Sequence, residues 1–319
     1  MRQIRRYIPY LIMLLFATWC AFSLHGDLAQ LSLAPVLRSW DLVMLAALLS
    51  LLNYLLRIIR WRAYLGRLGH GVPLRFAALT FLAGFAYTLS PGKIGEMVRA
   101  RYYVPRGVPV SDVAAAFFAE RFLDLVAMIA LAALLFSSSG RYASTIVGGA
   151  AGAVAILLAV ALLPWPTIAT SLRSALKIPS SLRSMLINIA STLASTRALM
   201  SPGMLLIGFT IGLMAWGLEG AGLGLLSSMF PPIHLDPLTA TGIYGVAVLI
   251  GGLSFLPGGL GSTEAVMTTL LATHGYSVSQ SLLVTLTCRL VTLWLGVIVG
   301  WCAVLGLRQR MTALVTPWK

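Results

Sequence analysis

The side chains of this chain that could do chemistry are charged groups within long apolar segments. Nine residues are acidic, and five of these lie in such segments together with two arginines. If the segments cross a membrane, each charge costs about 2.5–3.5 kcal/mol at mid-depth unless it is paired or hydrated. Charges kept at that cost are typical of a functional site. The set comprises Glu96, Glu120, Asp124, Glu219, Glu264, Arg121 and Arg289.

Arginine suits an anionic ligand, because its planar guanidinium presents a fork of donors that matches phosphate. We therefore expect Arg121 and Arg289 to bind an anionic head group. Glu96 and Glu264 would pair with these arginines in the empty site, or carry protons that drive a transport cycle. Backbone N–H groups at helix starts after Gly-rich breaks would add donors to the same anion. The alternative is that these charges only join parts of the protein as buried ion pairs.

Neighbouring charges extend this candidate site. Glu120 and Asp124 are four residues apart on the helix expected from residue 112, and Arg121 lies three residues before Asp124. The three side chains therefore form one charged patch. Lys93 also lies in an apolar segment and joins the candidate substrate-binding set. Glu219 has no counterpart in the internal repeat described below, and we interpret it as a helix–helix contact.

A second cluster, Asn53, Arg57, Arg60 and Trp61, falls near one face of a helix at the expected cytoplasmic interface. Arg and Trp are common there, because their apolar parts lie in lipid while their polar ends reach water. We favour this interfacial interpretation for Arg57 and Arg60. Binding of a lipid phosphate is the alternative, and it keeps both arginines among the candidate site residues.

The composition decides which class of protein must position these groups. Of 319 residues, 59% are apolar and 10% are charged, whereas a soluble domain carries roughly 25% charged residues. A soluble enzyme, a disordered chain and a disulfide scaffold are therefore excluded, and an all-α polytopic membrane protein is predicted. The net charge of +14 indicates membrane topology rather than nucleic acid.

No metal, cofactor or redox chemistry is predicted. The cysteines lie in apolar segments without a metal or redox spacing, and the histidines are isolated from one another. These residues are Cys20, Cys288 and Cys302, with His25, His70, His234 and His274.

Hydropathy predicts six spanning helices in a single membrane domain, 1–319. Two further apolar stretches, 74–108 and 238–275, are interrupted by Pro and Gly, and we expect each to enter and leave by the same face. The segment 166–201 is expected to be a cytoplasmic linker, either an amphipathic helix on anionic lipid or a solvated helix. The expected spans are 8–24, which we take as a retained helix rather than a signal peptide, 40–59, 112–136, 144–164, 202–230 and 281–306.

The basic residues predict the orientation. In the six-span arrangement eighteen of them, including Arg57, Arg60 and Arg99, lie on the cytoplasmic side, and only Arg38 and Arg141 lie outside. This bias places both termini in the cytoplasm. An eight-span alternative would move Arg99 and its neighbours Arg101 and Arg106 to the outside, which the bias disfavours.

An internal repeat links the two interrupted stretches. At an offset of 168 residues Glu96 corresponds to Glu264 and Arg121 to Arg289, while the two Pro-Gly breaks correspond at an offset of 166. We assign a first unit to 40–136, with its core at 84–125, and a second to 202–306, with its core at 252–293. Their opposite orientation predicts an inverted repeat around a cavity, an architecture known from transporters. The alternative is that Pro-Gly merely kinks two helices.

At these residues the chain resembles the lysylphosphatidylglycerol synthase transmembrane, flippase-like family of bacteria and archaea. The resemblance covers about 8–306 and implies an integral inner-membrane protein that handles lipid head groups. Full-length synthases of the family carry a soluble catalytic domain after the membrane part, and this chain ends at Lys319, so we do not expect the synthase activity. The matching motifs are Asn53-Tyr-x-x-Arg57-x-x-Arg60-Trp61, Gly84-Phe85 leading to Pro91-Gly-Lys-x-Gly95-Glu96-x-x-Arg99, Glu120-Arg121-x-x-Asp124, and Leu256-Pro-Gly-Gly-x-Gly261-x-x-Glu264.

The function expected from these observations is that of a lipid flippase, not an enzyme. Its ligands would be membrane lipids with anionic head groups, either phospholipids or polyprenyl-phosphate sugars, with proton coupling as one way to drive it. One alternative is a membrane-embedded lipid-phosphate transferase using Glu120, Asp124 and Glu264 as acids and bases. Another is a scaffold of an envelope-lipid assembly. The sequence predicts neither the lipid, nor the direction of movement, nor the coupling ion, nor the oligomeric state.

Overall fold

The computed structural model of the chain describes residues 32–136, 148–149, 151–152, 155–156, 159–160, 163–174 and 179–310. Within these ranges the secondary structure is helical and contains no strand, as the predicted all-α class requires. The predicted span 8–24, most of the predicted span 144–164 and both chain ends fall outside these ranges.

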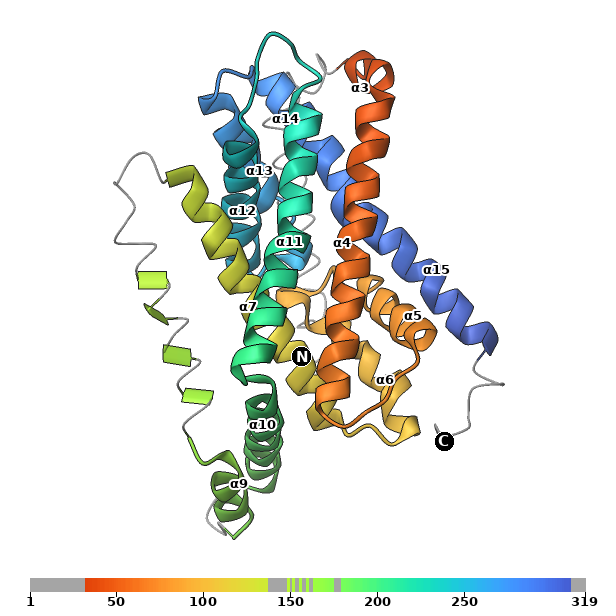
Figure 1. Cartoon of the computed structure of the whole chain (residues 1–319), viewed down its shortest axis with the longest axis vertical. Helices are drawn as coiled ribbons and strands as arrows, with labels where there is room; N and C mark the ends of the chain where they lie inside the picture. The colour runs from red at the N-terminus through yellow and green to blue at the C-terminus, as the bar shows by residue number, and fades with distance from the viewer. Residues whose placement is uncertain are drawn as a thin grey trace, which may run out of the picture.

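Long helices form the framework of the described part (Figure 1). Helix α11 contacts both α4 and α7, so these three stand side by side. Among the described residues, three runs are long and apolar enough to cross a membrane: Trp40–Arg67, Pro202–Ser227 and Val278–Arg308. The framework consists of α4 (Trp40–Arg67), α7 (Val110–Phe136), α11 (Pro202–Ser227), and a continuous run of α14 (Val278–Arg289), a π-helical turn η4 (Leu290–Trp294) and α15 (Leu295–Arg310).

The first interrupted stretch breaks where the sequence predicts. Helix α5 (Leu74–Phe85) ends before the Pro-Gly segment, which forms the 3₁₀ helix η1 (Pro91–Arg99). The chain continues through α6 (Ala100–Tyr103) and the short 3₁₀ turn η2 (Val104–Arg106). Because η1 packs against α5, the stretch folds back on itself.

The second interrupted stretch has a similar plan. Helix α12 (Pro237–Leu253) starts at Asp236, whose Oδ2 accepts hydrogen bonds from the backbone N–H groups of Leu238 and Thr239. The Pro-Gly break follows as the 3₁₀ turn η3 (Pro257–Gly259), and α13 (Ser262–Thr273) then packs back against α12.

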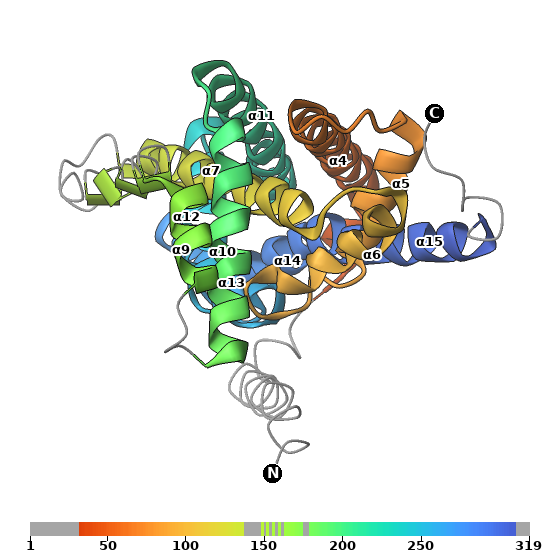
Figure 2. The ribbon, with the colours of Figure 1, turned by 90° about the horizontal axis from the view of Figure 1, so that it is seen from below.

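Short helices surround the framework. Helix α3 (Ala34–Arg38) precedes α4. The expected linker 166–201 comprises α9 (Trp165–Ser174) and α10 (Ser180–Leu199), which pack against each other. Helix α10 also packs against α7, as the view from below shows (Figure 2).

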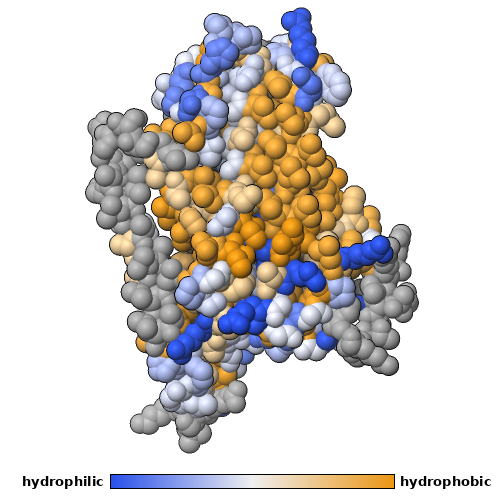
Figure 3. All heavy atoms as spheres, viewed as in Figure 1, coloured by the Kyte–Doolittle hydropathy of each residue, from blue (hydrophilic) through white to orange (hydrophobic). Residues whose placement is uncertain are grey.

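The outer surface of the framework is apolar. Leu48, Leu51 and Leu55 of α4 and Ile298 and Leu305 of α15 are all exposed. Figure 3 shows a broad hydrophobic band across the middle of the molecule, with hydrophilic residues towards both ends. Soluble monomers rarely expose an apolar patch of this extent, whereas hydrocarbon solvates it well.

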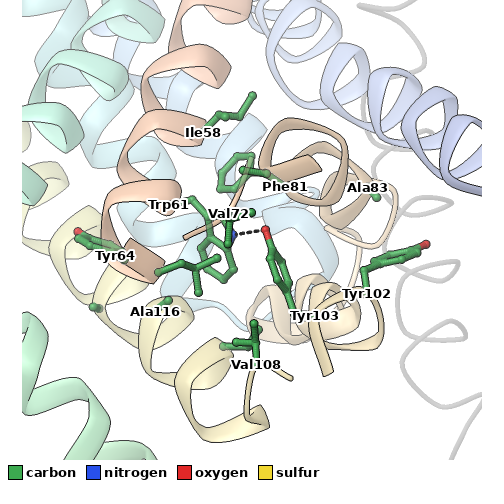
Figure 4. Close-up of a cluster of buried hydrophobic side chains, with 14 of the residues drawn as sticks. Ile58, Trp61, Tyr64, Val72, Phe81, Ala83, Tyr102, Tyr103, Val108 and Ala116 are labelled. Carbon is green, nitrogen blue, oxygen red and sulfur yellow. Dashed lines mark hydrogen bonds between the residues drawn. The ribbon is translucent and has the colours of Figure 1, made fainter. Parts of the chain in front are cut away.

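An aromatic core fixes the first interrupted stretch against α4 (Figure 4). The indole Nε1 of Trp61 donates a hydrogen bond of 3.0 Å to the hydroxyl of Tyr103, and that hydroxyl lies 2.8 Å from Thr80 Oγ1. Trp61 and Tyr103 are almost completely buried, and Phe81 packs beside Trp61. This core therefore holds α4, α5 and α6 together. It also sets the position of the charged residues on α4 and on η1, which connects α5 to α6.

Candidate functional site

A cavity of about 280 Å³ lies where the two interrupted stretches meet. Both breaks line it, through Gly92 and Lys93 of η1 and through Gly258 and Gly259 of η3. Helices α4, α7, α11, α12 and α14 contribute further parts of the wall, together with single residues of α5, α13 and α15 and with the turn η4. Its volume is close to the ~300 Å³ at the lower end of ligand pockets, which suits a compact head group.

The two breaks adopt matching backbone conformations. Gly92 and Lys93 have φ angles of 60° and 56°, and Gly258 and Gly259 have φ angles of 63° and 67°. This left-handed region costs a non-glycine residue about 1–2 kcal/mol, and glycine avoids that cost. Lys93 alone of the four therefore holds a strained backbone, at the wall of the cavity.

The breaks also touch each other. A Cβ on Gly92 would lie 4.0 Å from Phe255 Cδ1, in the segment before the second break. A Cβ on Gly258 would lie 2.6 Å from Leu89 Cδ2, in the segment before the first break. The close approach at Gly258 leaves no room for a side chain unless Leu89 moves.

Glu264 and Arg289 form the ion pair that the sequence predicts. Arg289 Nε donates to Glu264 Oε1 at 2.6 Å, and Arg289 Nη2 donates to the backbone carbonyl of Gly258 at 2.7 Å. Glu264 Oε2 accepts the backbone N–H of Gly261 at 2.6 Å, which caps the start of α13. The pair thus compensates backbone groups that the break would leave without partners.

Glu96 has a different main partner from the one expected. Its Oε2 accepts a hydrogen bond of 2.7 Å from Arg99 Nη2, and its Oε1 accepts one from Thr88 Oγ1. Arg121 is further away, with Nη2 at 3.9 Å from Glu96 Oε2. The expected Glu96–Arg121 pair is therefore secondary, because Arg99, three residues along the same turn, reaches the carboxylate first.

Glu120 is the centre of the charged cluster. Arg57 Nη2 donates to its Oε1 at 3.0 Å, and Arg99 Nη1 donates to its Oε2 at 2.9 Å. The guanidinium of Arg121 forms a third ion pair with it at 2.8 Å. The side chain of Glu120 is completely buried, so these contacts replace the water that would otherwise solvate it.

Asp124 binds a further arginine one turn later. Its Oδ1 accepts a hydrogen bond of 2.6 Å from Arg60 Nη2, and Arg57 Nη2 lies 3.4 Å from its Oδ2. Arg60 also donates to the carbonyl of Gly208 on α11. Helices α4, α7 and α11 are thereby joined by charge-assisted hydrogen bonds.

Three arginines counted on the cytoplasmic surface are buried instead, which corrects the interfacial interpretation. Arg57 is 4% exposed, and Arg60 and Arg99 are 0% exposed. Hydropathy along the chain places Arg57 and Arg60 at the end of a span and Arg99 in an interrupted stretch, but all three side chains turn inward to the carboxylates of α7 and η1. The expectation that Arg57 and Arg60 reach the membrane surface is wrong. All three arginines were also counted among the cytoplasmic surface charges, and that is wrong because they are buried.

Arg121 and Lys93 are two cations of the cavity wall that are less buried than Arg57. The Arg121 side chain is 19% exposed, and its Nη2 forms ion pairs with Glu120 at 2.8 Å and with Asp124 at 3.3 Å. Within the described chain, no carboxylate lies within 4.0 Å of Lys93 Nζ, which sits 5.4 Å from the ring centre of Trp216. Both cations line the cavity and are available to a ligand.

Cations exceed carboxylates around the cavity. The described residues place six cationic side chains and five carboxylates in its wall or directly behind it, so the site favours an anion. No group of three or more His, Cys, Asp or Glu residues within these ranges could hold a metal ion. The charged residues are Arg57, Arg60, Lys93, Arg99, Arg121 and Arg289, with Glu96, Glu120, Asp124, Glu219 and Glu264.

Three features of the site were missed from the sequence. Arg99 lies in the Glu96-x-x-Arg99 motif, whose spacing of three residues signals a pair on a helical turn. Glu219 makes the expected helix–helix contact, with Ser50 of α4, but also lines the cavity. The π-helical turn of η4 gave no sequence signal. The carbonyl of Thr292, within this turn, accepts a hydrogen bond of 2.6 Å from Tyr54.

Comparison with known proteins decides the family. The chain matches the family described as the lysylphosphatidylglycerol synthase TM region over residues 10–300. It belongs to this family. The match includes both breaks and the whole charged cluster, and it confirms the resemblance inferred from the motifs. A search of curated proteins gives no match. Family membership and the apolar helices together indicate a multi-pass membrane protein with a lipid-related function.

Proposed function

We propose that this protein is a lipid flippase of the bacterial inner membrane. An anionic head group, from a phospholipid or a polyprenyl-phosphate sugar, crosses through the central cavity while the hydrocarbon tail stays in the bilayer. The observation that carries the proposal is the cavity between the two breaks, where Lys93 has no ion pair in the described part of the chain and the side chain of Arg121 is 19% exposed. Lys93 forms no ion pair in the described part of the chain, so it can bind a phosphate oxygen without losing one, whereas Arg121 is partly exposed and keeps Glu120 and Asp124 as ion-pair partners.

The inverted repeat is part of the proposal. We infer that 74–108 and 238–275 are re-entrant hairpins that approach the cavity from opposite faces, within repeat units 40–136 and 202–306. Helices α5 and α6 lie in the lower half of Figure 1, whereas α13 and the start of α14 lie in the upper half. Matching left-handed residues at the two tips, and the contact between the tips, support this arrangement. With the predicted spans outside the described ranges, it gives six crossings.

We assign the lower end of Figure 1 to the cytoplasm. Exposed arginines gather at the end of α4 and on the segments of the first hairpin next to it, where they would meet anionic lipid and water: Arg62, Arg67, Arg75 and Arg101. This assignment keeps both chain termini on the cytoplasmic side.

Exposed apolar side chains beside the cavity support passage of a lipid rather than of a free anion. Ile94 and Phe255, at the tips of the two breaks, are 66% and 71% exposed beside the cavity. Apolar side chains at this place would border the hydrocarbon tail while the head group lies in the polar interior. Movement of the head group needs no bond to be made or broken.

The arrangement of the carboxylates disfavours the transferase alternative. Glu120, Asp124 and Glu264 are each held by one or more arginines, whose donors occupy the carboxylate oxygens. A general acid or base needs a free oxygen facing the reacting group. The scaffold alternative gives no role to a charged cavity.

Reconstitution tests the proposed function. Purified protein in liposomes is supplied with fluorescent phosphatidylglycerol or a fluorescent polyprenyl-phosphate sugar, and a membrane-impermeant quencher reports the fraction in the outer leaflet. The parent protein should increase the crossing of at least one probe over protein-free liposomes, and Arg121→Ala and Arg289→Ala should reduce it. If both variants moved the probes as fast as the parent protein, at equal amounts of folded protein, the role assigned to these arginines would be wrong.

A further inference from the structure

Glu219 differs from the other carboxylates of the cavity because it has no cationic partner. It lies on α11, is 4% exposed and lines the cavity. Its Oε2 accepts a hydrogen bond of 3.1 Å from Ser50 Oγ of α4. Throughout the part of the chain that the structure describes, no Lys, Arg or His nitrogen lies within 4.0 Å of this carboxylate. An arginine binds each of the others: Glu96, Glu120, Asp124 and Glu264.

None of the cations around Glu219 forms an ion pair with it in the described part of the chain. Trp216, three residues earlier on α11, has the guanidinium of Arg57 at 5.3 Å and the ammonium of Lys93 at 5.4 Å from its ring centre. Arg289 is held by Glu264. The charge of Glu219 therefore interacts with these cations only at longer range, and no ion pair in the described part of the chain fixes its protonation state.

Other titratable groups face Glu219 from every element that packs against α11. Helix α4 presents Tyr54 and Arg57, η1 presents Lys93, and α12 presents Tyr244. Helix α14 presents Cys288 and Arg289, while α7 brings Asp124 to the same cavity, bound by its arginines. These groups are either neutral hydroxyls and thiols, cations, or a carboxylate neutralised by arginine.

An anion in this cavity would oppose the ionised form of Glu219. The cavity is small, so a phosphate bound at Lys93 or Arg121 would share it with the unpaired carboxylate. Two like charges in a space shielded from water repel each other strongly, and protonation of one removes the repulsion. Entry of the anion and uptake of a proton by Glu219 are therefore linked, and the linkage acts in both directions.

We propose that Glu219 is the proton-binding residue of the transport cycle, which takes up a proton when an anionic head group enters the cavity and returns it to water when the head group leaves. The inference rests on the proposed flippase function and names its coupling ion. The proton comes from water and adds to a carboxylate oxygen, and no other bond changes. Head group and proton thus cross together.

Calorimetry measures the linkage directly. Dioctanoyl phosphatidylglycerol is titrated into the purified full-length protein in two buffers that differ in ionisation enthalpy, and the difference in heat gives the protons taken up per lipid. The parent protein should take up a fraction of a proton, rising to about one at the most favourable pH. Glu219→Gln, which keeps the size and the acceptor for Ser50, should bind the lipid with no uptake. Asp41→Asn, at an exposed acid in the first turn of α4, is the control and should behave as the parent.

Ser50→Ala provides a second test, which leaves Glu219 in place and removes only the hydrogen bond that it accepts from Ser50. Removing the O–H donor disfavours the ionised form of Glu219, so the pH of maximal proton uptake should move upward. Glu219→Asp keeps a carboxylate and should retain uptake.

Equal uptake in the parent and Glu219→Gln, or an unchanged pH profile of proton uptake in Ser50→Ala, would overturn the assignment while leaving the flippase function in place. Absence of any lipid binding by the parent would contradict the proposed function itself, and the coupling with it.

Discussion

Lys93 of the first break and Gly259 of the second occupy corresponding positions and share a left-handed backbone, with φ angles of 56° and 67°. The second break follows the ordinary rule that such a position is glycine. The first break places a lysine there, whose ammonium reaches the cavity wall beside Trp216. At this pair of corresponding positions only Lys93 carries the strain of a left-handed non-glycine residue, and we infer that its side chain serves the proposed function rather than folding.

Lys93→Gly should therefore separate folding from transport. Glycine removes about 1–2 kcal/mol of backbone strain, but it loses more conformational entropy on folding, at a cost of roughly 0.5–1 kcal/mol. The free energy of unfolding should therefore stay within about 1 kcal/mol of that of the parent. Loss of a charge-assisted contact worth about 1.5–3 kcal/mol should lower lipid affinity roughly tenfold or more. Thermal unfolding in detergent and lipid titration measure the two effects. Lys93→Arg should keep most of the affinity, and a Lys93→Gly protein that binds lipid like the parent would contradict this prediction.

Arg121 and Arg99 should respond differently to the same substitution. In Arg121→Gln every carboxylate keeps another arginine, so the unfolding temperature should barely change while head-group binding falls. In Arg99→Gln, Glu96 loses its closest partner in a completely buried place, which should destabilise the fold by about 3–5 kcal/mol. Thermal unfolding of the two variants side by side tests the difference. Equal destabilisation would show that Arg121 is as structural as Arg99.

Much of the framework could be predicted from the sequence. Composition gave the membrane class, and Pro-Gly segments located both breaks, because these residues disturb helices whatever surrounds them. The Glu264–Arg289 pair followed from a repeated spacing. Burial of Arg57 and Arg60 was predicted wrongly, since it depends on carboxylates that α7 brings from more than sixty residues away. The cavity position of Glu219 likewise depends on how α4, α11 and α12 pack.

The contact between the two breaks has a test in paired glycine substitutions. Gly258→Ala places a Cβ against Leu89 and imposes a positive φ on alanine, which should destabilise the protein by about 1–2 kcal/mol and reduce transport. Gly252→Ala, on α12, has open space around the new Cβ and should leave stability equal or slightly higher. Unfolding temperatures of the two variants provide the comparison. Equal unfolding temperatures in the two variants would show that the close contact between the breaks does not contribute to stability.

The proposed six-span topology predicts the side on which each loop is labelled. After replacement of Cys20, Cys288 and Cys302, single cysteines at Arg67 and Arg101 should both react with a membrane-impermeant maleimide only from the cytoplasmic side. An eight-span chain would carry position 101 to the opposite side from position 67. Labelling of intact cells and of inverted membrane vesicles distinguishes the two outcomes.

The most direct measurement of the central claim is the crossing of fluorescent phosphatidylglycerol and of a fluorescent polyprenyl-phosphate sugar in liposomes that contain the parent protein or Lys93→Gly. The account predicts that the parent moves at least one of these anionic lipids faster than protein-free liposomes do, and that Lys93→Gly, equally folded, loses roughly nine-tenths of that activity. Crossing of neither lipid by the folded parent, or equal crossing with and without the lysine, would contradict it.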